Sequence, residues 1–160
     1  MKENLEFASL QDNAGGLLSP DDVRLFYYDI AFDGEKNYLF PYVWNAEVQS
    51  YVDREEIIVE EKEKKDIPQC FAENTIFMTV NDNEDKAMAL FRHLRNAFSH
   101  YRINRNGDWL LAKDHPNGNA NELTMIMKID SKYFYNIISL LFKQKAQAEE
   151  EYNKLMNPEI

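Results

Sequence analysis

The clearest periodic pattern of apolar side chains lies near the middle of the chain, from about residue 84 to residue 101. Its members recur at spacings of three and four, which is typical of a helix with one buried side. They are Ala87, Leu90, Phe91, Leu94, Phe98 and Tyr101. We therefore predict a helix over 84–101 and expect Tyr101 to pack into the core with the rest of this stripe.

Helical patterns also precede this segment. Ser19-Pro20-Asp21-Asp22 is typical of a helix start, because serine caps, proline suits the first turn and acids favour the positive end of the dipole. We expect that helix to end near Gly34, and a second apolar and aromatic pattern covers 38–52. The segment 55–65 is ambiguous, since Ile57-Ile58-Val59 suits a strand while the flanking Glu and Lys residues favour a helix. We predict a helix there, with its charged end solvated.

After the central helix the pattern changes to that of turns and strands. Asn106-Gly107 is a turn dipeptide, and two short apolar segments lie between residues 109 and 129. They predict a two-stranded hairpin over about 109–129 with a long tip. A final helix follows, capped by Asp130 or Ser131.

This succession predicts a mainly α fold, a helical bundle with one small hairpin before the C-terminal helix. The 160 residues fit one domain with a real core. Residues 1–18 show weak periodicity and contain Gly15-Gly16, so we predict a partly ordered arm there and a single domain over 19–160.

Composition bears on where the protein is located and on whether it binds a metal or a cofactor. No apolar run is long enough to span a membrane, and the N-terminus lacks the basic and apolar pattern of a signal peptide. The single Cys70 cannot form an internal disulfide, which is typical of a reducing cytoplasm. We expect no cofactor and no metal, because the chain has no glycine-rich phosphate loop and its Cys and His residues show no ligand spacing.

Charge is unevenly distributed along the chain. The formal net charge is −10, which disfavours general coating of nucleic acid. Between Arg92 and Arg105, however, the chain carries four arginines, two histidines and no acid. Arginines this concentrated can receive an anion.

On a helical wheel at about 100° per residue, the side of the central helix away from the apolar stripe is polar. Arg92, Arg95 and Ser99 lie along one flank, and His93, Asn96 and His100 lie along the other. Asn96 and His100 are neighbours one turn apart, whereas Arg95 and His100 are about 140° apart with Asn96 between them. These groups can share one groove only if a second surface closes over the polar side.

The segment Arg95-Asn96-Ala97-Phe98-Ser99-His100 resembles the R-N-x-x-x-H form of the R-x4–6-H signature of HEPN-domain proteins. The order of signature helix, short hairpin and C-terminal helix is most similar to the bacterial branch built around a plasmid-encoded HEPN nuclease. The resemblance covers roughly residues 84–142 and implies a small helical bundle. It also implies a metal-independent endoribonuclease of a bacterial defence, stress or toxin system, such as a toxin–antitoxin pair or phage defence.

The resemblance implies roles for individual residues. Arg95 and His100 would be the catalytic pair and Asn96 the polar residue beside them, in a homodimer whose two signatures line one cleft. Histidine titrates near neutrality and can move a proton, while arginine can hold two phosphate oxygens of RNA. Candidate phosphate-binding residues are Arg92, Arg102 and Arg105, and possible auxiliary residues are His93 and Ser99, with His93 more simply a solvated or interface residue.

Two other readings remain open. The protein can be a non-catalytic HEPN-like dimer, an interaction or regulatory protein whose acidic surface meets a basic protein partner. It can also be a helical structural module in which the signature match is accidental, and that reading predicts no groove at Arg95 and His100.

Overall fold

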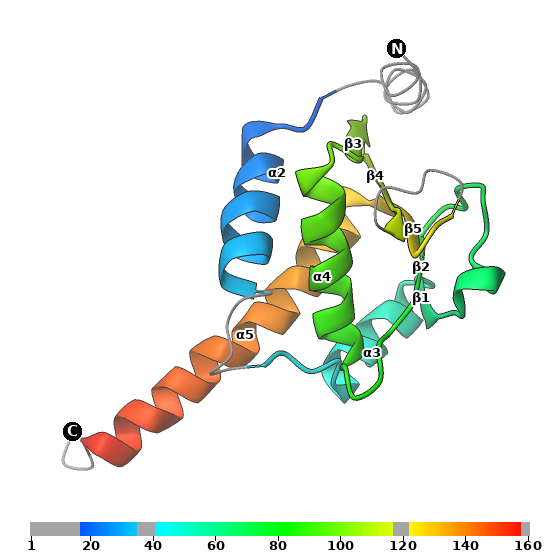
Figure 1. Cartoon of the computed structure of the whole chain (residues 1–160). Helices are drawn as coiled ribbons and strands as arrows, with labels where there is room; N and C mark the ends of the chain where they lie inside the picture. Colours follow the sequence, from blue (N-terminus) through cyan, green and yellow to red (C-terminus); the bar gives the residue numbers. More distant parts are fainter. Residues whose placement is uncertain (1–16, 35–40, 117–121, 158–160) are drawn as a thin grey trace.

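A computed structural model of the chain describes residues 17–34, 41–116 and 122–157 (Figure 1). Nearly all of the predicted arm, residues 1–18, lies outside these ranges. The described residues form a mixed α/β fold with 52% in helices and 19% in strands. The predicted mainly α bundle with a two-stranded hairpin is therefore wrong.

The strands form one five-stranded mixed sheet in the order β1-β2-β5-β4-β3. The edge strand β1 (Ile58–Glu61) runs parallel to β2 (Thr75–Met78). Next come β5 (Met125–Asp130), β4 (Trp109–Asp114) and the second edge strand, β3 (Ile103–Asn106), each antiparallel to its neighbour. The predicted hairpin over about 109–129 is present as β4 and β5, but it forms the middle of a wider sheet.

Two long helices cover one face of this sheet (Figure 1). In chain order, the helical elements of the described residues begin with α2 (Pro20–Arg24), which continues as the π-helix η1 (Leu25–Gly34). They go on with α3 (Ala46–Arg54), the short 3-10 helix η2 (Lys64–Asp66), α4 (Lys86–Ser99) and α5 (Ser131–Met156). Helices α4 and α5 lie on the sheet, and the α2–η1 helix packs along α4. The C-terminal half of α5 projects away from the body.

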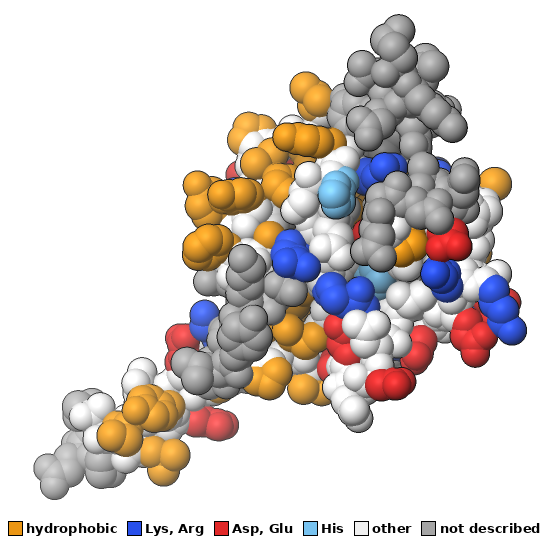
Figure 2. Space-filling model, in the orientation of Figure 1, with side chains coloured by type: hydrophobic (Ala, Val, Ile, Leu, Met, Phe, Trp, Pro, Cys, Tyr) orange, Lys and Arg blue, Asp and Glu red, His pale blue; other side chains and the backbone are white. Residues whose placement is uncertain are grey.

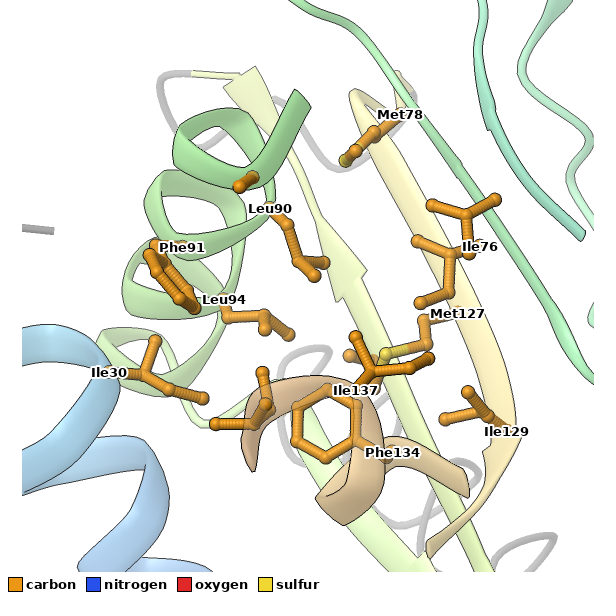
Figure 3. Close-up of a cluster of buried hydrophobic side chains, with 14 of the residues drawn as sticks. Ile30, Ile76, Met78, Leu90, Phe91, Leu94, Met127, Ile129, Phe134 and Ile137 are labelled. Carbon is orange, nitrogen blue, oxygen red and sulfur yellow. The ribbon is translucent and has the colours of Figure 1, made fainter. Parts of the chain in front are cut away.

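The main core lies between the sheet and the helices, as Figure 3 shows. Leu90 and Leu94 of α4 point toward Met127 of β5, and Phe134 of α5 closes the cluster from below. These four side chains are fully buried. A second, smaller hydrophobic cluster lies where the segment after β1 packs against the sheet. It contains Ile67, Leu123 and Ile126, and Phe71 and Phe77 pack against it.

Side-chain caps mark several helix starts, as the sequence predicts. Ser19 accepts the N–H of Asp22 in a capping box, and Asp130 accepts the N–H of Lys132 at the start of α5. Asp85 caps α4 and also accepts the N–H of Trp44 at 2.7 Å. The start of α4 is thereby tied to the chain that leads into α3.

The helix predicted over 55–65 is wrong. Residues 58–61 form β1, whose Val59 is buried while Ile58, Glu60 and Glu61 are exposed. A four-residue edge strand is held by its pairing with β2, and this non-local contact outweighs the helix propensity of Glu and Lys. Among the described residues, no helix combines the length and apolar character needed to cross a bilayer.

Candidate functional site

The segment Arg95–His100 lies at the C-terminal end of α4, which ends two residues before the predicted end at residue 101. The helix ends at Ser99, and His100 is its C-cap residue. The N–H of Tyr101 bonds to the carbonyl of Phe98 at 3.1 Å, and the N–H of Arg102 bonds to that of Ala97 at 2.8 Å. These two bonds define a Schellman ending, in which the residue after the cap takes a left-handed conformation.

Tyr101 occupies that left-handed position, with φ of 58°. Its side chain is therefore turned away from the apolar stripe and is 76% exposed. The prediction that Tyr101 packs in the core is wrong, because the helical spacing on which it depends stops two residues earlier. Glycine is the usual residue at this position, since a β-carbon is strained there.

The three signature residues lie at this helix end, and two of their side chains are in contact. Arg95 and Asn96 are half-buried, and Nη2 of Arg95 donates to Oδ1 of Asn96 at 3.1 Å. The N–H of His100 bonds to the carbonyl of Asn96 at 3.2 Å, while the His100 and Ser99 side chains are exposed. An arginine whose guanidinium is held by Asn96 and an exposed histidine therefore occupy the last turns of the same helix.

Arg92 lies elsewhere on α4, in an ion pair that sequence analysis did not predict. Its Nε and Nη2 each donate to one carboxylate oxygen of Glu84 at 2.9 Å. Burial alone would raise the pKa of Glu84, but hydrogen bonds from Arg92 and from the N–H of Asn81 lower it below its ordinary value. Arg92 therefore holds its own carboxylate, and its predicted phosphate contact competes with this pair.

Arg105 is part of a second network, which links the α2–η1 helix to the sheet and α5. Its Nε and Nη2 donate to the two oxygens of the fully buried Asp22 at 2.6 and 2.9 Å. Tyr135 donates a short hydrogen bond to the same carboxylate. Burial acts to raise the pKa of Asp22, but Arg105, Tyr135 and the N–H of Ser19 together lower it to about 2. Arg105 is thus placed to hold the fold, and its predicted phosphate role also competes with an ion pair.

His93 is fully buried, so it is neither solvated nor exposed at an interface of this chain. Its Nδ1 lies 2.7 Å from Oδ2 of Asp114 in β4, and its Nε2 lies 2.7 Å from the carbonyl of Thr79. The ring therefore links α4 to β4 and to the residue that follows β2. Sequence analysis could not find Asp114, because the pair is 21 residues apart and depends on the position of β4.

Hydrophobic side chains gather on the surface beside the end of α4. We define the aromatic patch as the exposed residues Val23, Tyr27, Tyr28, Phe32 and Tyr101, which are 42%, 49%, 60%, 66% and 76% exposed. Figure 2 shows this hydrophobic surface over the α2–η1 helix, next to blue basic and pale blue histidine side chains. The Tyr27 ring lies 6.2 Å from that of Phe98 on α4, so the patch reaches the signature helix.

Comparisons with known proteins give no relative: no family model matches the chain, and neither does any curated protein or solved structure. Within the described ranges there is also no group of three or more His, Cys, Asp or Glu side chains arranged to hold a metal ion. The function must therefore be argued from the site itself.

Proposed function

We propose that this chain is a cytoplasmic, metal-independent endoribonuclease, with Arg95, Asn96 and His100 as its catalytic residues. The observation that carries the proposal is the arrangement at the end of α4. An arginine held by a neighbouring amide and an exposed imidazole share one helix end, beside a surface that can receive a second molecule. The R-N-x-x-x-H resemblance supports the same assignment.

Each residue has a role that its chemistry can perform. His100 takes the proton of a ribose 2′-hydroxyl, because an exposed imidazole can bind and release protons near neutral pH. The 2′ oxygen then attacks the adjacent phosphorus, and the bond to the 5′ oxygen breaks. Arg95 stabilises the extra negative charge on the phosphate, and Asn96 fixes the guanidinium. The products are a 2′,3′-cyclic phosphate and a 5′-hydroxyl.

The departing 5′ oxygen needs a proton donor, and within one copy of the chain His100 already serves as the proton acceptor. The chain has three histidines; His93 and His115 are buried, which leaves His100 as the exposed one. A homodimer in which two α4 ends face one phosphate would provide a second imidazole. The aromatic patch beside His100 supports such an arrangement, since exposed apolar surface of this kind favours association.

Among the predicted phosphate-binding arginines, Arg102 fits the proposal best. It is half-buried and directly follows the exposed Tyr101, two residues from His100. Ser99 is exposed beside the pair and stays a possible auxiliary residue, whereas the burial of His93 leaves it a structural role. A defence, stress or toxin setting, with a regulatory protein partner, follows from the resemblance and stays a prediction.

The test is cleavage of RNA in EDTA by the wild-type chain and by His100→Ala and Arg95→Ala. Both residues lie outside the fully buried core, so the variants should stay folded, which circular dichroism checks. Arg54→Ala is the matched control, because Arg54 is an exposed arginine on α3, which begins near the opposite end of α4. We expect cyclic-phosphate products from the wild type and the control, and at least a 100-fold lower rate from each site variant.

A second candidate function is supported by the same aromatic patch. If a folded wild-type dimer cleaves no RNA, or if His100→Ala cleaves as fast as the wild type, the nuclease assignment is refuted. The chain would then be a non-catalytic interaction protein, with the patch and its acidic exterior as binding surfaces.

A further inference from the structure

In the part of the chain that the structure describes, no other element covers the last two turns of α5. We define the α5 tip as residues 149–156, all of which are exposed. Tyr152, Leu155 and Met156 are 58%, 79% and 61% exposed, and their spacing of three and four puts them on one side of the helix. Figure 2 shows hydrophobic side chains on the projecting helix. A helix end of this kind gains stability when its apolar side is covered.

The α5 tip and the aromatic patch are complementary in charge. The tip carries three glutamates, Glu149–Glu151, and one lysine, Lys154, which gives a net charge of −3 + 1 = −2. The patch lies beside Arg95, Arg102 and His100 at the end of α4, and the exposed Arg24 is on the same helix as four of its residues. Asp21 lies 3.8 Å from Arg24, and both are well exposed; the half-buried Asp29 lies on the same helix. An acidic apolar segment therefore has a matching surface on the same chain.

The two surfaces also match in size. Eight helical residues extend about 12 Å, and the patch follows the α2–η1 helix over a similar length, from Val23 to Phe32. Both combine aromatic or aliphatic side chains with charged neighbours, which is the usual composition of a protein–protein contact.

A tip cannot reach the patch of its own chain. Helix α5 is continuous from Ser131 to Met156, and its C-terminal half points away from the body (Figure 1). Contact within one chain would require this helix to break and fold back. We propose that the α5 tip docks on the aromatic patch of a second copy, and that two copies exchange their tips reciprocally.

Reciprocal exchange forms a closed dimer, because each copy offers one tip and one patch and uses both. We orient the tip with Glu149–Glu151 of one copy toward Arg95 and His100 of the other, because this places its acidic end next to basic side chains. The next consequence rests on the proposed function: these carboxylates occupy positions that RNA phosphates would take, so RNA must displace them. The exchange would then limit cleavage to RNAs that bind strongly enough to displace these carboxylates while the apolar side of the tip stays docked.

The test is sedimentation equilibrium of the full chain over a range of concentrations. A tip variant carries Tyr152→Glu and Leu155→Glu. A patch variant carries Tyr28→Glu and Phe32→Glu, and all four side chains are exposed, so neither variant loses core. The matched control for the tip carries Ala146→Glu and Gln147→Glu, exposed positions on α5 outside residues 149–156.

We expect the wild type and the control to dimerise, and each variant to show a dissociation constant at least tenfold weaker. A mixture of the two variants should dimerise better than either alone, because the tip of the patch variant is intact and so is the patch of the tip variant. High salt should weaken the wild-type dimer, since charges contribute to the contact.

Two results would overturn the exchange. One is a wild type that stays monomeric at all concentrations, and the other is a tip variant that dimerises as well as the control. If only the patch variant fails to dimerise and mixing restores nothing, the patches pair with each other instead. RNA cleavage by the same variants is read separately, so a tip variant that is still dimeric and cleaves RNA refutes the exchange and leaves the nuclease standing.

Discussion

Replacing Asp22 with asparagine tests the network that joins the α2–η1 helix to the sheet. The buried carboxylate of Asp22 accepts two hydrogen bonds from Arg105 and one from Tyr135. Asparagine has nearly the same shape but no charge, so the change removes the ion pair without leaving a cavity. The α2–η1 helix carries the aromatic patch, and its attachment therefore matters for the site as well as for stability.

The size of the effect follows from the pKa of Asp22. That pKa falls from 3.8 to about 2 in the folded chain. Each unit of pH corresponds to about 1.4 kcal/mol, so the ionised group stabilises the fold by about 2 kcal/mol at pH 7. Because Arg105 is partly open to solvent, screening reduces this value, and we expect a loss of about 1–2 kcal/mol in the free energy of unfolding.

The effect has a defined pH dependence. A carboxylate with a lowered folded-state pKa stabilises fully above its unfolded pKa and loses that contribution as the pH falls through the folded value. The difference between the wild type and Asp22→Asn should therefore be constant above about pH 4 and shrink between pH 4 and pH 2.

Urea denaturation at pH 7, 4 and 2.5 measures this difference. Asp21→Asn is the matched control, because Asp21 lies on the same helix but its side chain is 82% exposed. The control should change the free energy of unfolding by less than about 0.5 kcal/mol. Equal effects of the two substitutions at pH 7, or an Asp22→Asn loss that is unchanged at pH 2.5, would refute the argument.

Three further substitutions test other parts of the structure by urea denaturation. His93→Ala leaves the buried carboxylate of Asp114 without the imidazole and should lower the free energy of unfolding by about 3 kcal/mol. A double-mutant cycle with Asp114→Asn should show a coupling above about 1 kcal/mol, and additive effects would contradict the contact. Tyr101→Gly relieves the left-handed conformation and should keep or slightly raise stability, by up to about 1 kcal/mol, whereas a loss above 1 kcal/mol would contradict the exposed ring. Phe91→Ala removes a fully buried ring that meets Tyr42 at 5.3 Å and should cost about 3–5 kcal/mol; a loss below 1 kcal/mol would place Phe91 outside the core.

Local signals in the sequence were sufficient for the features that depend on neighbouring residues. The stripe of apolar residues predicted α4, since helical periodicity is set within a few turns, and Leu90, Phe91 and Leu94 are buried as expected. The cap at Ser19 was predicted for the same reason, and so was a cap at Asp130 or Ser131, of which the structure has Asp130. The wheel also placed Arg95 on one polar flank of this helix and Asn96 and His100 on the other.

The sheet could not be predicted in the same way. Strands β1, β2 and β3 have four residues each, which is too short for alternation to outweigh the helix-forming residues around them. Strands β1 and β2 form because they pair with each other and with β5 across at least 17 positions in the chain, whereas β3 pairs with β4 through the short turn at Gly107-Asp108. The fold class was wrong for this reason.

The chain by itself determined that α4 is a helix, which side of it is buried, and that Asn96 and His100 are neighbours one turn apart, because these properties depend on residues a few positions apart. Only the tertiary structure decided which charged groups are engaged. Arg92, Arg105 and His93 meet Glu84, Asp22 and Asp114 at distances of 8, 83 and 21 residues along the chain. It also decided that Tyr101 faces solvent and that η1 exposes an aromatic surface, because exposure depends on which other elements pack against a residue.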